Sequence, residues 1–196
     1  TPVLRIFERD YNQVDVSLRP RDGGWQIGLN TREAVGDVFW RSAGEGWVEG
    51  NFKRLAIRPA AEAGEVSTSL INSLPGMNLV VEDFILGDMA LGKLELNARN
   101  EKGAWYLDTL NLQNPDGGLK GKGVWVNTGS HQTRLDFELT AKDVGKLLGR
   151  LGHADAVRRG SAKLAGGLRW NGALTSIHYP SLSGQMTVDA EKGQFN

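Results

Sequence analysis

Alternation of apolar and polar residues, repeated in about ten segments, is the feature of this sequence that most constrains its fold. In segment 133–140, Leu or Phe occupies positions 135, 137 and 139, and charged residues occupy positions 134, 136 and 138. A period of two is typical of a strand with one buried and one solvated face. The chain is therefore predicted to be mainly β, with strands over residues 3–7, 14–19, 25–29, 36–40, 47–57, 79–86, 91–98, 105–112, 119–125, 133–140, 162–170 and 181–190.

One short amphipathic helix is predicted directly after segment 133–140. The apolar residues change there to a spacing of three and four, which places them on one face of a helix over about residues 141–151. Thr140 and Asp143 resemble a capping box, and Gly152 suits the position after the helix end. Because the neighbouring segments are strands, we expect this helix to lie on a sheet or to plug one end of it. The predicted helix face consists of Val144, Leu147, Leu148 and Leu151.

The chain divides into two β segments. Residues 1–58 are predicted to form a β-meander, and residues 59–74, which are small and acidic without periodicity, to form a linker or excursion. Residues 75–196 form a second β segment that carries the helix and is expected to continue beyond the sequence, because strand-like residues reach both ends. The patterns Leu-x-Gly-x-Gly-x-Trp at 119–125 and Leu-x-Gly-x-Leu-x-Trp at 164–170 form a weak internal repeat, which predicts similar strand modules stacked along one sheet.

The composition argues against several classes of function. The 23 basic and 23 acidic residues give no net charge, so the whole chain offers no electrostatic attraction for nucleic acid, and no nucleic-acid partner is predicted. The sequence has no cysteine, which excludes disulfides, thiolate metal sites and cysteine nucleophiles. No run approaches the roughly 18 apolar residues of a membrane-spanning helix.

No motif in the sequence indicates catalysis. His131, His153 and His178 are far apart and have no second ligand at metal-binding spacing, so no metal site is predicted. The glycines of segment 121–123 lie inside a predicted strand with no helix after it, which argues against a phosphate cradle. The acidic residues alternate with apolar ones, as on the solvated side of strands. We therefore expect no catalytic residue, no cofactor and no enzymatic activity.

Periodicity alone leaves two architectures open. A β-sandwich, or a sheet with its apolar face under a helix, accounts for the alternation and is the more common arrangement. The other is an open, strongly curved sheet whose concave apolar face forms a channel for acyl chains. A single helix provides little cover for so many strands, which favours the open sheet. Four tryptophans beside turns are interpreted as the rim of a sheet: Trp25, Trp105, Trp125 and Trp170.

An ordered series of short motifs covers residues 74–195. It begins with LPGMNLVVEDF at 74–84 and GKLEL at 92–96. It continues with LNL at 110–112, PDG at 115–117, GKGVW at 121–125, TRLDF at 133–137, DVG at 143–145, DAVR at 155–158, LRW at 168–170 and LSG at 182–184. In this order the motifs resemble the YhdP family of AsmA-like envelope proteins. The resemblance implies an elongated, curved antiparallel sheet with a hydrophobic groove, and it brings no catalytic motif.

The resemblance also implies a location and a function. Proteins of this family are large proteins of Gram-negative bacteria, with an inner-membrane anchor and a long periplasmic β body, and are implicated in moving phospholipid towards the outer membrane along the groove. The chain is thus expected to be a periplasmic segment of such a bridge, with phospholipid acyl chains as its partners. The residues expected to line the groove are Leu94, Leu96, Leu107, Leu135, Phe137, Leu139, Leu164 and Leu168.

An alternative function remains open at this point. The chain is then a non-catalytic periplasmic scaffold or assembly module with a closed apolar core, and a strand edge or loop binds another envelope protein. A dry, covered core favours the scaffold, and an open apolar surface favours the conduit.

Overall fold

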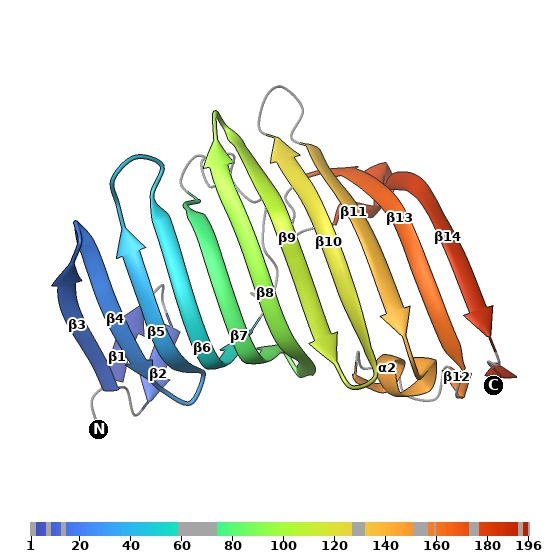
Figure 1. Ribbon diagram of the computed structural model, residues 1–196, viewed down its shortest axis with the longest axis horizontal. Helices are drawn as coiled ribbons and strands as arrows, with labels where there is room; N and C mark the ends of the chain where they lie inside the picture. Colours follow the sequence, from blue (N-terminus) through green and yellow to red (C-terminus); the bar gives the residue numbers. More distant parts are fainter. Residues whose placement is uncertain are drawn as a thin grey trace.

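The computed structural model describes the backbone of residues 3–6, 9–12, 15–58, 74–126, 132–150, 157–158, 160–172, 177–191 and 194–195, and the side chains of the longer ranges, 15–58, 74–126, 132–150, 160–172 and 177–191. The protein is mainly β. One open, curved sheet of eleven strands accounts for most of it, in the order β14-β13-β11-β10-β9-β8-β7-β6-β5-β4-β3 (Figure 1). Its strands are β3 Asp15–Arg21, β4 Gly24–Asn30, β5 Ala34–Arg41, β6 Trp47–Ile57, β7 Gly76–Leu86, β8 Met89–Glu101, β9 Ala104–Asn114, β10 Gly117–Val126, β11 Gln132–Ala141, β13 Ser161–Asn171 and β14 Ser183–Glu191.

Four short strands and two short helices complete the described part. The pairs β1 with β2 and β12 with β15 form separate two-stranded sheets. Their strands are β1 Val3–Ile6, β2 Arg9–Asn12, β12 Val157–Arg158 and β15 Gln194–Phe195; the helices are α2 Val144–Arg150 and the 3₁₀-helix η1 Tyr179–Ser181. The prediction of a mainly β chain with one short α-helix is confirmed.

The sheet is mixed, whereas an antiparallel sheet was expected. Strands β6 and β7 are parallel neighbours, with Phe52 opposite Val81, and the other pairs in the sheet are antiparallel. A parallel pair needs a crossover of a dozen or more residues, and the connection from Ile57 to Gly76 is that long. Both β segments thus belong to one sheet. The predicted linker at 59–74 lies outside the described residues except for Leu74.

The core consists of side chains that pack beside one another on one face of the sheet. One cluster is centred on Ala98, Trp105, Leu107 and Trp125. A second is centred on Phe52, Val81, Phe84 and Leu94. Most of these residues follow the alternation within β6 to β10, because every second side chain of a strand points to the same face, and Phe84 joins them after a register shift beyond Val81.

Helix α2 lies at one end of the sheet, beside the ends of β10, β11 and β13 (Figure 1). The predicted start and cap were wrong: Thr140 and Ala141 belong to β11, and the helix begins at Val144. Asp143 is the N-cap, because its Oδ1 accepts a hydrogen bond of 3.0 Å from the Lys146 N–H. Arg150 at the other end forms an ion pair with Asp116 in the turn between β9 and β10. The helix therefore plugs the end of the sheet, one of the two positions expected.

Candidate functional site: an apolar face of the sheet

The strand register places apolar side chains in three rows that cross the whole sheet on one face. Each row takes one residue from every strand, in order from β3 to β14. The middle row is Leu18, Ile27, Val38, Gly50, Leu79, Leu96, Leu110, Gly121, Phe137, Gly166 and Met186. The row on one side of it is Pro20, Trp25, Trp40, Val48, Met77, Ala98, Leu107, Gly123, Leu135, Leu168 and Gly184. The row on the other side is Val16, Leu29, Gly36, Phe52, Val81, Leu94, Leu112, Leu119, Leu139, Leu164 and Val188.

These three rows, which we call the apolar band, contain no charged, amide or hydroxyl side chain. The opposite face differs sharply. Its corresponding row is Ser17, Gly28, Asp37, Asn51, Val80, Glu95, Asn111, Lys120, Glu138, Ala165 and Thr187. One face of the sheet is thus uniformly apolar from edge to edge, and the other is polar and charged.

The band has the dimensions of a path rather than of a pocket. Neighbouring strands lie about 4.8 Å apart, so eleven strands give a length of about 48 Å. Residues on the same side of a strand are about 6.8 Å apart, so three rows cover a width of about 14 Å. At both edges the band is open to solvent, since Leu18 on β3 is 56% exposed and Met186 on β14 is 55% exposed.

Over β9 to β13 the band has a border at each end of the strands. At one end Trp105, Trp125, Thr133 and Trp170 lie side by side on β9, β10, β11 and β13, and all four are buried. The Trp105 indole N–H donates to the Pro75 carbonyl at 3.2 Å. At the other end the buried Leu147 of α2 lies close to Gly117 of β10. The tryptophans and the helix thus limit the width of the band in this half of the sheet.

All eight residues predicted to line a groove lie in the band. Leu94 and Leu107 are buried, at 4% and 3% exposure, and form part of the packed layer. The other six are half-buried, so each presents part of its surface outward. The eight predicted residues therefore share one face of the sheet and lie on β8, β9, β11 and β13. Their contact with lipid is not tested by the structure and stays a prediction.

The predicted helix face is placed only in part. Leu147 is buried, Val144 and Leu148 are half-buried, and Leu151 lies outside the described residues. Leu147 is the residue that approaches the sheet, at Gly117.

The internal repeat has a clear structural meaning. Its two copies lie in β10 and β13, the two strands that flank β11, and they are in the same register. Trp125 and Trp170 lie on either side of Thr133, and Gly121 and Gly166 lie on either side of Phe137. The repeat therefore gives β11 two similar neighbours on the apolar face.

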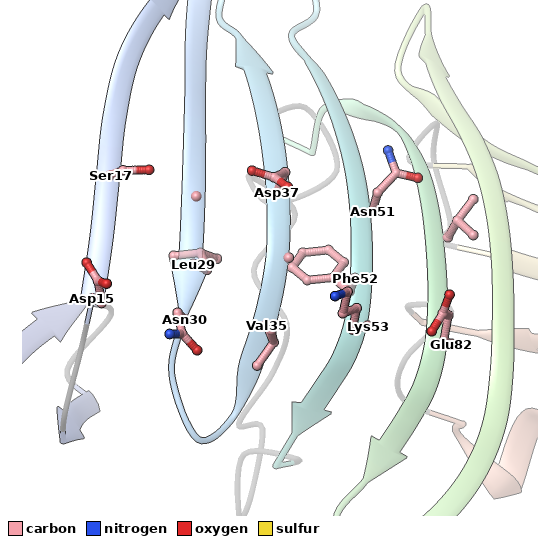
Figure 2. A pocket seen from close by; sticks show the side chains of 13 residues that line it. Asp15, Ser17, Leu29, Asn30, Val35, Asp37, Asn51, Phe52, Lys53 and Glu82 are labelled. Carbon is pink, nitrogen blue, oxygen red and sulfur yellow. The ribbon is translucent and has the colours of Figure 1, made fainter.

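The polar face carries two open hollows that sequence reasoning missed. The first has a volume of about 550 Å³ over β3 to β7 and is mainly acidic and amide-lined, with Asp15, Asp37, Asn51 and Glu82 among its side chains (Figure 2). The second, of about 620 Å³ over β9 to β13, combines the lysines of β10 with the acidic residues of β11. Most of the lining residues come from strands that follow one another along the chain, and β7 in the first hollow and β13 in the second join them through long connections.

The remaining polar groups of the described residues include one close cluster around Arg99 and one pair at His178. On the polar face, Arg99 donates to Asp108 at 3.0 Å and stacks over the Tyr106 ring, and the hydrogen bond to Asp108 raises the pKa of its guanidinium. Within the described ranges no three His, Asp or Glu side chains lie close enough together to hold a metal ion. His178 Nδ1 lies 2.8 Å from Ser181 Oγ; His131 and His153 lie outside the described residues.

Comparison with known proteins decides the family. The family model described as YhdP protein matches residues 1–196, the whole of the chain. The chain belongs to the YhdP family. Membership indicates an AsmA-like protein of the cell envelope, and the YhdP family is not known as a family of enzymes. No curated protein and no solved structure matches the chain.

In the part of the chain that the structure describes, no helix has the length and apolar character needed to cross a bilayer.

Proposed function

We propose that this YhdP-family chain is a periplasmic segment of a bridge that conducts phospholipid between the inner and outer membranes. The acyl chains lie against the apolar band, and the lipid moves across the strands, from one edge of the sheet towards the other. The observation that carries this proposal is the continuity of the three rows, which cross eleven strands without a polar side chain. No catalytic step is part of it.

The energetics of an apolar band suit movement better than retention. Contact with an apolar surface is non-directional, and each buried methylene contributes about 0.8 kcal/mol wherever it lies. A lipid that advances by one strand therefore exchanges similar contacts, because the next strand presents another apolar side chain or a glycine at the same level. A charged side chain within the band creates a barrier, and the sequence places none there.

The exposed surface of the band supports the same proposal. In a closed core the central positions of a strand are fully buried. Here Leu96, Leu110 and Phe137, in the middle of the middle row, remain half-buried. Leu18 and Met186, the two ends of the same row, are more than half exposed.

Site-specific photo-crosslinking on β11 tests the proposal. A photo-reactive residue is placed in turn at Leu135, Phe137 and Leu139, and at Asp136 and Glu138 on the opposite face as matched controls. The protein is irradiated in cells, and adducts are identified by mass spectrometry. We expect phospholipid adducts at the three odd-numbered positions and none at the two even-numbered ones.

Two results would overturn this proposal. Equal lipid labelling of both faces shows non-specific contact with membrane. Absence of lipid at all five positions, with a protein trapped instead, shows that this part of the chain is a scaffold for another envelope protein.

A further inference from the structure

Helix α2 covers part of the apolar face at the end of β10 and β11 (Figure 1). A Cβ atom added at Gly117 would lie 3.4 Å from Leu147 Cδ2, so the Leu147 side chain packs directly on the backbone of β10. Gly117 is paired with Ala141 of β11, and both residues are buried. They lie two residues beyond Leu119 and Leu139, on the same side of their strands, and so continue the apolar face by a fourth row.

This fourth row consists of small residues over β10 to β14. Its members are Gly117, Ala141, Ala162 and Ala190. The first two are buried, Ala162 is half-buried and Ala190 is exposed. Small residues at this level leave room for a helix on the sheet, and α2 occupies that room beside β10.

The apolar contact that holds α2 on the sheet is small. Of its seven residues Leu147 alone is buried, whereas the core of the sheet contains two clusters of large apolar side chains. Seven residues are also far fewer than the roughly 12–15 at which an isolated helix becomes marginally stable. Parts of a protein with few buried apolar contacts open at a lower free energy than its core. We therefore expect α2 to leave the sheet more readily than the strands separate.

Two glycines, Gly145 and Gly149, weaken the helix further. Gly149 has no steric need for glycine, because a Cβ atom added there would meet no atom within 4 Å and its φ angle is not positive. Alanine at this position would stabilise the helix without a clash. The helix is thus weaker than its surroundings require.

Polar contacts fix both ends of α2. At its start the Val144 N–H donates to the Gly160 carbonyl at 2.9 Å. At its end the Arg150 guanidinium donates to the Asp116 carboxylate, in the turn between β9 and β10. The Arg150 side chain is 34% exposed. Because water reaches this ion pair, it stabilises the closed position only modestly and can open.

We infer that α2 is a lid, latched by the ion pair of Arg150 and Asp116, that opens as a unit while the sheet stays folded. Lys142 and Asp143 form its hinge, because β11 is paired with both neighbours as far as Ala141 and the helix begins two residues later. Opening uncovers the fourth row beside β10 and, in the proposed function, widens the apolar band at this end. The opening itself does not depend on lipid and is measured on the protein alone.

Thiol labelling tests the lid. The sequence has no cysteine, so an introduced cysteine supplies a unique thiol. Leu147→Cys places it on α2, and Leu107→Cys makes the same replacement in the core of the sheet; these leucines are 7% and 3% exposed. In the folded protein the thiol of Leu147→Cys should react at least about a hundredfold faster than that of Leu107→Cys, because the first needs only the lid to open and the second needs the sheet to unfold.

Three further replacements, each made in both cysteine variants, test the latch and the helix. Arg150→Gln removes the latch and should speed labelling in Leu147→Cys about tenfold, the change expected for loss of a hydrogen bond between charged groups. Gly149→Ala should slow it about fivefold, the ratio that corresponds to the helix propensities of glycine and alanine. Lys142→Gln removes the charge of an exposed side chain next to the helix and should leave the rate unchanged. Labelling in Leu107→Cys should not respond to any of the three.

Three results would overturn the inference. If the thiol of Leu147→Cys reacts as slowly as that of Leu107→Cys, α2 opens only when the sheet unfolds and is a fixed plug. If Arg150→Gln and Lys142→Gln have the same effect, the ion pair is not a latch. If Arg150→Gln speeds labelling equally in both cysteine variants, the ion pair stabilises the whole sheet and not the lid.

Discussion

Single residues of the apolar face show how an all-apolar surface accommodates the few polar groups at its border. Thr133 is fully buried between Trp125 and Trp170, although it carries a hydroxyl. Its Oγ1 donates a hydrogen bond of 2.6 Å to the Gly172 carbonyl. A buried hydroxyl with a partner is tolerated, whereas an unpartnered one is costly. This bond ties the end of β11 to the end of β13.

Thr133→Val is expected to lower the free energy of unfolding by about 1–3 kcal/mol, because it removes the hydroxyl and leaves the Gly172 carbonyl without its partner. The replacement has nearly the same shape, so packing changes little. Urea unfolding at equilibrium measures the loss. Thr133→Ser keeps the hydroxyl and should lose less than Thr133→Val; the reverse order would show that the methyl group, and not the hydrogen bond, holds this position.

Leu107 and Leu139 both lie in the band but should respond differently to truncation. Leu107 is 3% exposed, so Leu107→Ala leaves a cavity and should lower the free energy of unfolding by about 2–5 kcal/mol. Leu139 is half-buried and presents part of its side chain outward, so Leu139→Ala should lower it by only about 1 kcal/mol. Urea unfolding of both variants checks this. Equal losses at the two positions would mean that another part of the protein covers Leu139.

Whole elements were predictable where local periodicity decides them. Segment 47–57 was predicted as a strand and coincides with β6, and the other ten strands of the sheet were also found, most of them a few residues too short. The eight lining residues share one face because alternation fixes the side of each strand. The sequence thus contained the fold class and, within each strand, the residues that share a face.

Local periodicity does not predict which strands pair when they are far apart in the sequence. The parallel pair of β6 and β7 depends on the path between them, which no period records. Each polar hollow includes one strand that joins through a long connection, β7 beside β6 in the first and β13 beside β11 in the second. The strands β2, β12 and β15 are too short for alternation to appear. The cap of α2 was misplaced because β11 pairs with β10 and β13 as far as Ala141, and this pairing keeps Thr140 in the strand.

Helix α2 has only seven residues and should depend strongly on its cap. Asp143→Ala removes the acceptor for the Lys146 N–H and should lower the stability of the helix by about 0.5–2 kcal/mol. Hydrogen exchange read by NMR should show faster exchange of the Leu147 amide, with the amides of β8 and β9 unchanged. Asp143→Asn keeps a capping oxygen, so the Leu147 amide should exchange more slowly in this variant than in Asp143→Ala. Unchanged protection of Leu147 in Asp143→Ala would show that packing against the sheet, and not the cap, holds α2.

At the scale of the whole molecule, the central claim is that the apolar band is continuous. Eleven strands join two β segments into one sheet through the β6 and β7 pair, and all three rows cross that junction without a break. Single-layer sheets of this kind leave an apolar face that soluble proteins ordinarily cover. In the function that we propose, a lipid occupies the band and the charged opposite face remains in water.

Lipid flux past a single charge in the middle row tests this claim most directly. Leu96→Asp and Asn97→Asp introduce the same carboxylate at neighbouring residues of β8, on the apolar and on the polar face. In cells where the full-length protein is the only route, the arrival of newly made phospholipid in the outer membrane is followed by pulse labelling, and Tm and protein levels confirm folding. Leu96→Asp should slow the arrival by about an order of magnitude, because an acyl chain that passes a hydrated carboxylate loses roughly two methylene contacts. Asn97→Asp should have no effect on the arrival. Unchanged flux in folded Leu96→Asp protein, or equal slowing by both variants, would contradict the account.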